Sequence, residues 1–147
     1  MMKTTSLIFL FLWMITSSFD QKPGGIRGKV VWKAGNVMPG PDRPRASGQP
    51  VKREIHVYAL TKMSEANTID AGGFYDSVRT QLVKKVVSDA QGRFRVSLPP
   101  GQYSVFVKEP KGLWANLSDG EMNINPVAVK PGQFSTVTLV VDYAAVY

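Results

Sequence analysis

The sequence predicts an all-β protein built as an antiparallel Greek-key sandwich of about seven short strands. Apolar residues alternate with polar ones at a period of two, turn residues separate the alternating segments, and helical periodicity is almost absent. The chain has 147 residues, of which 44% are hydrophobic and 20% are charged. This length and composition are typical of one globular domain with a real core and exclude a disordered chain.

The first residues predict a secretory signal peptide that is not part of the fold. Lys3 gives a positive start, residues 7–15 are an unbroken apolar run, and residues 16–18 supply the small side chains of a cleavage site. The apolar run is shorter than the ~20 residues that a membrane-spanning helix needs. We therefore expect residues 1–18 to be cleaved after Ser18, with no membrane span in the mature chain.

The mature part, residues 19–147, is expected to be a single domain that is secreted or periplasmic. The chain has no cysteine, which excludes disulfides, thiol chemistry and a lipid anchor on an N-terminal cysteine. Small secreted eukaryotic domains are often rich in cysteine, so the absence of cysteine favours a bacterial periplasm or surface.

The formal net charge of +7 favours anionic partners such as acidic glycans or lipid head groups, or serves solubility alone. The basic residues are spread over many segments, without a dense run and without a nucleic-acid-binding motif. The sequence therefore predicts no nucleic-acid partner.

Two strands are expected in the first half of the mature chain. Residues 26–33 form the first, with Val30 and Trp32 on one face, and residues 54–60 form the second. The inward face of the second strand holds Ile55, Val57 and Ala59.

Two connections are longer than a pair of strands requires. Residues 34–52 are rich in proline, glycine and arginine, and residues 61–81 contain one possible helical turn at residues 62–66, with Thr61 as its cap. Loops of such length are often functional or disordered, and we expect a direct contact with a partner at the end that holds residues 34–52 and 111–122.

The second half of the chain predicts the remaining strands and most of the core. Phe94 and Val96 point inward and Arg93 and Arg95 outward, after a tight hairpin in which Gly92 supplies a positive φ. The predicted strands are residues 82–88, 93–98, 103–108, 123–129 and 135–142. The predicted core comprises Val30, Trp32, Val57, Phe94, Val96, Leu98, Tyr103, Val105, Val137 and Leu139.

Residues 87–105 carry a distinctive pattern. They contain Asp89-Ala90-Gln91-Gly92-Arg93-Phe94, followed by Leu98-Pro99-Pro100-Gly101-Gln102-Tyr103. This pattern resembles the carboxypeptidase regulatory-like domain. The resemblance implies a transthyretin-like (prealbumin-like), carbohydrate-binding-like sandwich that has no catalysis of its own and that usually accompanies a catalytic or transport domain.

No motif in the chain points to catalysis, a cofactor or a metal. His56 is the only histidine, and strand alternation places it outward between Ile55 and Val57, whereas a metal site needs several converging ligands. There is no Gly-x-Ser-x-Gly elbow. The transthyretin-like hydrolases of purine breakdown carry a C-terminal Tyr-Arg-Gly-Ser motif that residues 143–147 lack. We therefore expect a protein that is not an enzyme.

Antiparallel strands place alternate connections at opposite ends of a sandwich. On this basis residues 34–52, 89–92 and 109–122 share one end, and residues 61–81, 99–102 and 130–134 share the other. Trp114 and Phe74 should then not form one aromatic platform. The candidate binding residues, all at the first end, are Arg43, Arg45, Arg53, Lys111 and Trp114.

A tryptophan beside arginines is typical of a recognition site for a glycan or a protein. Alternatively, Trp114 folds back to cover the open end of the core. The function predicted from these observations is a non-catalytic binding or structural module of the cell envelope, accessory to a partner protein. The alternative is a carbohydrate-binding module that uses exposed loop aromatics.

Overall fold

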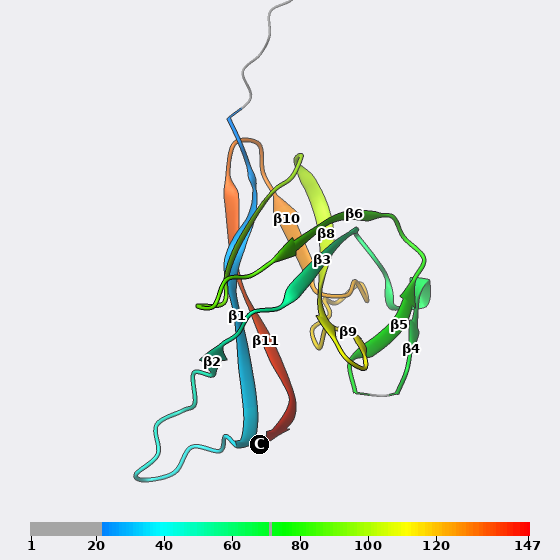
Figure 1. Ribbon diagram of the computed structural model, residues 1–147. Coiled ribbons are helices and arrows are strands. Elements are labelled where there is room, and N and C mark those ends of the chain that lie inside the picture. Colours follow the sequence, from blue (N-terminus) through cyan, green and yellow to red (C-terminus); the bar gives the residue numbers. More distant parts are fainter. Residues whose placement is uncertain (1–21, 71) are drawn as a thin grey trace, which may run out of the picture.

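The computed structural model describes residues 22–70 and 72–147, which fold into a β-sandwich of two mostly antiparallel sheets (Figure 1). The predicted fold class is therefore confirmed. The predicted signal peptide and its cleavage site lie outside the described residues. Within the described part of the chain, no helix has the length and apolar character needed to cross a membrane.

The four-stranded sheet is organised around β1 (Gly25–Asn36). β11 (Phe134–Val146) pairs with one edge of β1 in parallel, which departs from the all-antiparallel expectation. β7 (Arg93–Ser97) and the short β2 (Gln49–Pro50) share the other edge, both antiparallel. The first and last strands therefore lie side by side along their whole length.

Gly28 allows the close approach of the first and last strands. A Cβ atom at this position would lie 1.7 Å from the carbonyl oxygen of Val137. Only glycine fits so near a neighbouring backbone.

The seven-stranded sheet has the order β4-β5-β9-β8-β3-β6, and β10 also pairs with β8. Both β9 and β10 are antiparallel to β8, which is the longest strand of this sheet. The strands are β3 (Glu54–Ala59), β4 (Ala66–Thr68), β5 (Phe74–Val78), β6 (Leu82–Val87), β8 (Gly101–Glu109), β9 (Gly112–Trp114) and β10 (Pro126–Val129).

All seven predicted strands are present, with shifted ends. The two long connections are more ordered than the sequence predicted, because residues 34–52 contain β2 and residues 61–81 contain β4 and β5. The expected helical turn is a 3-10 helix, η1 (Met63–Glu65), and its N-terminal cap is Lys62 rather than the predicted Thr61. The tight hairpin also forms as predicted, with φ of 73° at Gly92.

The main core lies between the two sheets. Every predicted core residue is buried there except Trp32 and Val137, which are half-buried and pack against it. Strand alternation therefore identified the inward face of both sheets.

A second, smaller core covers the opposite face of the seven-stranded sheet. Phe106 on β8 is 0% exposed, and the rings of Tyr58 and Tyr75 meet it edge-on with centroids 5.5 and 5.7 Å away. The connection that contains η1, β4 and β5 supplies part of the cover, and Ile124 supplies another part. This face is therefore buried rather than solvated.

This second core corrects the expectation for His56. Alternation placed its side chain in solvent, but His56 is 7% exposed because it lies directly across from Phe106 on the covered face. Its Nε2 atom lies 2.7 Å from Oε1 of Glu54, and its Nδ1 atom has no partner among the described residues.

Candidate functional site

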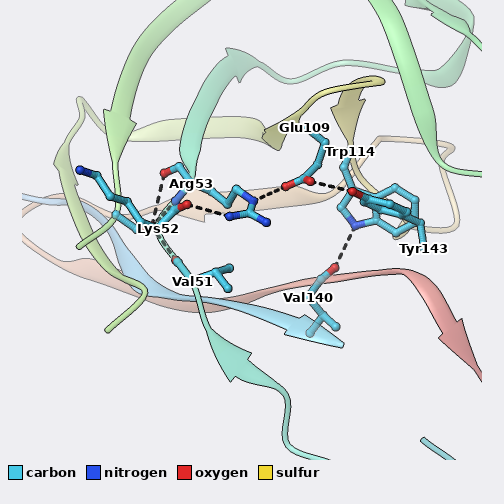
Figure 2. Close-up of polar contacts among 8 residues, drawn as sticks. Val51, Lys52, Arg53, Glu109, Trp114, Val140 and Tyr143 are labelled. Carbon is cyan, nitrogen blue, oxygen red and sulfur yellow. Dashed lines mark hydrogen bonds and ion pairs between the residues drawn. The ribbon is translucent and has the colours of Figure 1, made fainter. Parts of the chain in front are cut away.

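The buried carboxylate of Glu109 is the centre of a polar network at one end of the sandwich (Figure 2). Glu109 is the last residue of β8 and is 2% exposed. Nε of Arg53 donates to its Oε1 at 2.6 Å, and the hydroxyl of Tyr143 donates to its Oε2 at 2.9 Å. Both oxygens are thus satisfied, which offsets part of the cost of burying the charge.

Arg53 lies in the connection from β2 to β3 and is itself held in place by several neighbours. Its backbone N–H donates to Oγ of Ser88 at 2.8 Å, and its Nη1 donates to the carbonyl of Lys52 at 2.9 Å. The guanidinium also lies 5.9 Å from the ring centroid of Trp32. The orientation of Arg53 toward Glu109 is therefore fixed by contacts on several sides.

The network ties the two sheets together. Glu109 belongs to the seven-stranded sheet and Tyr143 to β11 of the four-stranded sheet. A second tie runs in parallel, because the indole Nε1 of Trp114 donates to the carbonyl of Val140 at 2.9 Å (Figure 2). Burial, together with the hydrogen bond and charge of Glu109, raises the pKa of Tyr143.

The ring of Tyr143 belongs to a cluster of four aromatic rings at this network. Tyr143 meets Trp32, Phe74 and Trp114 edge-on, with ring centroids 5.0, 4.9 and 5.3 Å away. Phe74 and Trp114 are themselves 4.9 Å apart and face each other in the register of β5 and β9. The expectation that these two rings lie at opposite ends was wrong.

The error has a simple physical cause. Loop parity assumes that each connection stays at the end where it begins, but residues 61–81 return to the sheet and form β5 as an added strand beside β9. The parity prediction holds for two connections of that same end, since residues 99–100 and 130–132 line one groove of about 650 Å³ together with residues 22–24.

Trp114 is a core residue and not a free platform. It is 5% exposed and its N–H group is occupied. The alternative that this ring covers the open end of the core is confirmed.

The structure places the other predicted binding residues in separate locations. Arg53 lies in the Glu109 network, and Lys111 lies 5.0 Å from the ring centroid of Phe74 and pairs with Asp70. The Lys111 ammonium group lowers the pKa of Asp70. Arg43 and Arg45 lie exposed in the connection between β1 and β2, and no contact described for residues 22–70 and 72–147 joins them to the network. Their role in binding stays a prediction.

Glu109 and Tyr143 were missed at the sequence level, although one of them leaves a signal. Glu109 continues the inward alternation of Tyr103, Val105 and Val107 on β8. A carboxylate at an inward position needs a partner, so this pattern predicts a buried ion pair. Nothing local identifies Tyr143 as that partner, because the contact spans the two sheets.

The described residues hold no group of three or more histidine, cysteine, aspartate or glutamate side chains placed to bind a metal ion. A groove of about 470 Å³ runs beside the connection between β1 and β2, lined by residues 32–34, 37 and 46–49. It is the concave surface nearest to Arg43 and Arg45 along the chain.

Comparisons with known proteins give only distant structural likenesses. No protein-family model and no curated protein matches the chain. A crystal structure of (S)-allantoin synthase is similar over 84% of this chain and 41% of that protein, with a TM-score of 0.40 and 14% identity. A Streptococcal ancillary pilin is similar over 80% of this chain and 32% of the pilin, with a TM-score of 0.36 and 21% identity. The chain spans less than half the length of either.

Proposed function

We propose that the protein is an exported, non-catalytic binding or structural module of the cell envelope that serves a partner protein. The observation that supports this proposal is the use of Glu109, a deeply buried acid whose two oxygens are both occupied by Arg53 and Tyr143. A general acid or base has to reach its substrate. Glu109 instead joins the sheets, which is a structural task.

The connection between β1 and β2 carries accessible cations. Arg43 and Arg45 are exposed on the connection that extends beyond the sheets, at the end where the C-terminus lies (Figure 1). Arginine pairs with carboxylates in a bidentate manner, which suits recognition of an acidic partner surface. Arg43 and Arg45 therefore lie where a partner protein has access to them.

The hairpin region supports the carboxypeptidase regulatory-like resemblance. Gly92 adopts the positive φ that the hairpin requires, and the hydroxyl of Tyr103 donates to the carbonyl of Pro99 at 2.6 Å. This hydrogen bond holds the turn of the Pro-Pro-Gly-x-Tyr segment against the strand that follows. A function as an accessory module is what this resemblance implies.

The alternative, a carbohydrate-binding module with exposed loop aromatics, has less support. Trp114, the aromatic residue among the predicted binding residues, is buried, and so is Phe74. The exposed rings of Tyr143 and Tyr147 lie on or beside the last strand rather than on a loop.

Two measurements test the proposal. N-terminal sequencing of the mature protein is expected to give a start near Phe19, as export requires. Cross-linking in intact cells, followed by mass spectrometry, is expected to identify an envelope partner for the wild type and to lose it in an Arg43→Ala/Arg45→Ala variant. A Lys84→Ala/Lys108→Ala variant removes equal charge from the seven-stranded sheet and serves as the matched control. Full-length protein in the cytoplasm, or equal cross-linking by all variants, would contradict the proposal.

A further inference from the structure

The outer face of the four-stranded sheet carries four cations in a regular grid. Arg27 on β1 lies directly across from Arg95 on β7, and Lys29 lies directly across from Arg93. All four are exposed, and we call them the basic face. Their neighbours on β11 are Thr136 and Thr138.

This arrangement is unfavourable for the free protein. Like charges directly opposite one another on neighbouring strands destabilise a sheet. Here two such pairs follow each other. Successive pairs are about 6.6–6.8 Å apart along the strands, and the two cations of one pair lie on strands about 4.8 Å apart. The core does not require these cations because they point away from it, although the Arg95 guanidinium packs over the ring of Phe134.

Little on the molecule neutralises the basic face. Arg93 pairs with Asp89 at 3.4 Å, an exposed contact of small energetic value. Within residues 22–70 and 72–147, Arg27, Lys29 and Arg95 form no ion pair. Three positive charges therefore remain available to an outside anion.

The shape of the face suits a ligand that lies flat on it. The four cations and the two threonines line one shallow depression of about 490 Å³. No segment of the described chain covers this face, whereas the outer face of the other sheet is closed by the second core. The threonine hydroxyls add hydrogen-bonding groups along one side, where Nε of Arg27 donates to Oγ1 of Thr136 at 3.3 Å.

We propose that the basic face binds a linear acidic polysaccharide whose successive sugars carry carboxylate or sulfate groups. The proposal gives the binding module proposed above a second ligand, at a surface other than the connection that holds Arg43 and Arg45, and rests on that function. Repeated anions along one chain match repeated cations along β1 and β7 by charge and by regularity. Guanidinium groups pair with carboxylate and sulfate in a bidentate manner.

Two other polyanions fit this face less well. Membrane binding needs apolar side chains that enter the bilayer, and the large exposed apolar residues of the described chain lie elsewhere. Single-stranded nucleic acid needs open aromatic rings for base stacking. The aromatic ring beside this face is Phe134, and the Arg95 guanidinium covers it at 3.8 Å from the centroid.

The test is isothermal titration calorimetry of the purified protein with heparin, which is sulfated, and with alginate, which carries carboxylates. Uncharged dextran is the negative control. The wild type is expected to bind at least one acidic polysaccharide, with an affinity that falls as salt rises because exposed charges are screened. Arg27→Gln/Arg95→Gln and Lys29→Gln/Arg93→Gln should each weaken binding at least tenfold. Lys84→Gln/Lys108→Gln, with the same loss of charge, should change it less than twofold.

A thermal melt without ligand separates binding from folding. Both double variants are expected to melt at or above the temperature of the wild type, because each removes a like-charge pair. Absence of binding to both polysaccharides, or equal weakening by the control variant, would overturn the proposal. So would tighter binding to duplex DNA or to vesicles of phosphatidylglycerol and phosphatidylcholine. Loss of binding in Arg43→Ala/Arg45→Ala alone would also overturn it, while leaving the proposed function intact.

Discussion

The outer faces of the two sheets differ, although side chains alternate between inward and outward positions along the strands of both sheets. On the four-stranded sheet the outward positions hold exposed cations such as Arg93 and Arg95. On the seven-stranded sheet the outward positions hold Phe106 and His56, and both are buried. A sandwich of two sheets has two outer faces, and here one is a surface while the other is the floor of a second core.

The difference is visible in the strands themselves. β7 alternates between buried and exposed residues, as a strand with one solvated face should. β8 is buried at every position from Tyr103 to Val107, which is the pattern of a strand covered on both faces. Asn123 is buried next to Ile124 of the second core, and the exposed carboxylate of Asp119 accepts hydrogen bonds from its backbone and its side chain.

Truncation of Phe94 on β7, in the main core, and of Phe106 on β8, in the second core, compares the two cores most directly. Phe106→Ala and Phe94→Ala are each expected to lower the free energy of unfolding by about 3–5 kcal/mol, because each leaves a cavity among buried residues. Urea denaturation measures both. A cost below about 1 kcal/mol for Phe106→Ala would mean that the second core is not a packed core.

Neutralisation of the buried carboxylate is expected to have the next largest effect. Glu109→Gln keeps the shape of the side chain but removes the charge that Arg53 faces and one acceptor for the Tyr143 hydroxyl. We expect a loss of about 1–3 kcal/mol in urea denaturation. The matched control is Glu121→Gln at an exposed position, which should cost less than about 0.5 kcal/mol. Equal costs would show that the two sheets do not depend on the network.

Acid titration tests the contact between Asp119 and Asn123. Hydrogen bonds from the side chain and then the backbone of Asn123 lower the pKa of Asp119 from its ordinary value of 3.8. A lowered folded-state pKa means that this stabilisation is complete above the ordinary value and is lost as pH falls through the lower one. The melting temperature of the wild type should therefore fall below about pH 4, and less steeply in Asp119→Asn. Parallel curves for the two proteins would contradict a stabilising role for Asp119.

The smallest effects are expected on the basic face. Arg93→Ala and Arg95→Ala should change the free energy of unfolding by less than about 0.5 kcal/mol, or raise it slightly, because both side chains are exposed and oppose like charges. The same urea series provides the measurement. If either change cost as much as Phe94→Ala, this face would be part of the packed structure and the contrast between the two outer faces would disappear.

Several features could be predicted from residues near one another in the chain. The alternation from Arg93 to Leu98 defines an inward and an outward face because successive side chains of a strand point to opposite sides. Gly92 marks the hairpin because few other residues adopt a positive φ. Both signals depend only on local backbone geometry.

Tertiary structure alone decided what covers each face and which distant groups meet. The parallel pairing of β1 with β11, the placement of Phe74 against Trp114 and the contact of Glu109 with Tyr143 all join segments far apart in the chain. Alternation divides a strand into two faces, but it cannot tell whether the second face meets water or another segment. That outcome depends on where residues 61–81 return to the sheet, and the return is set by burial of apolar surface over the whole chain rather than by any local preference.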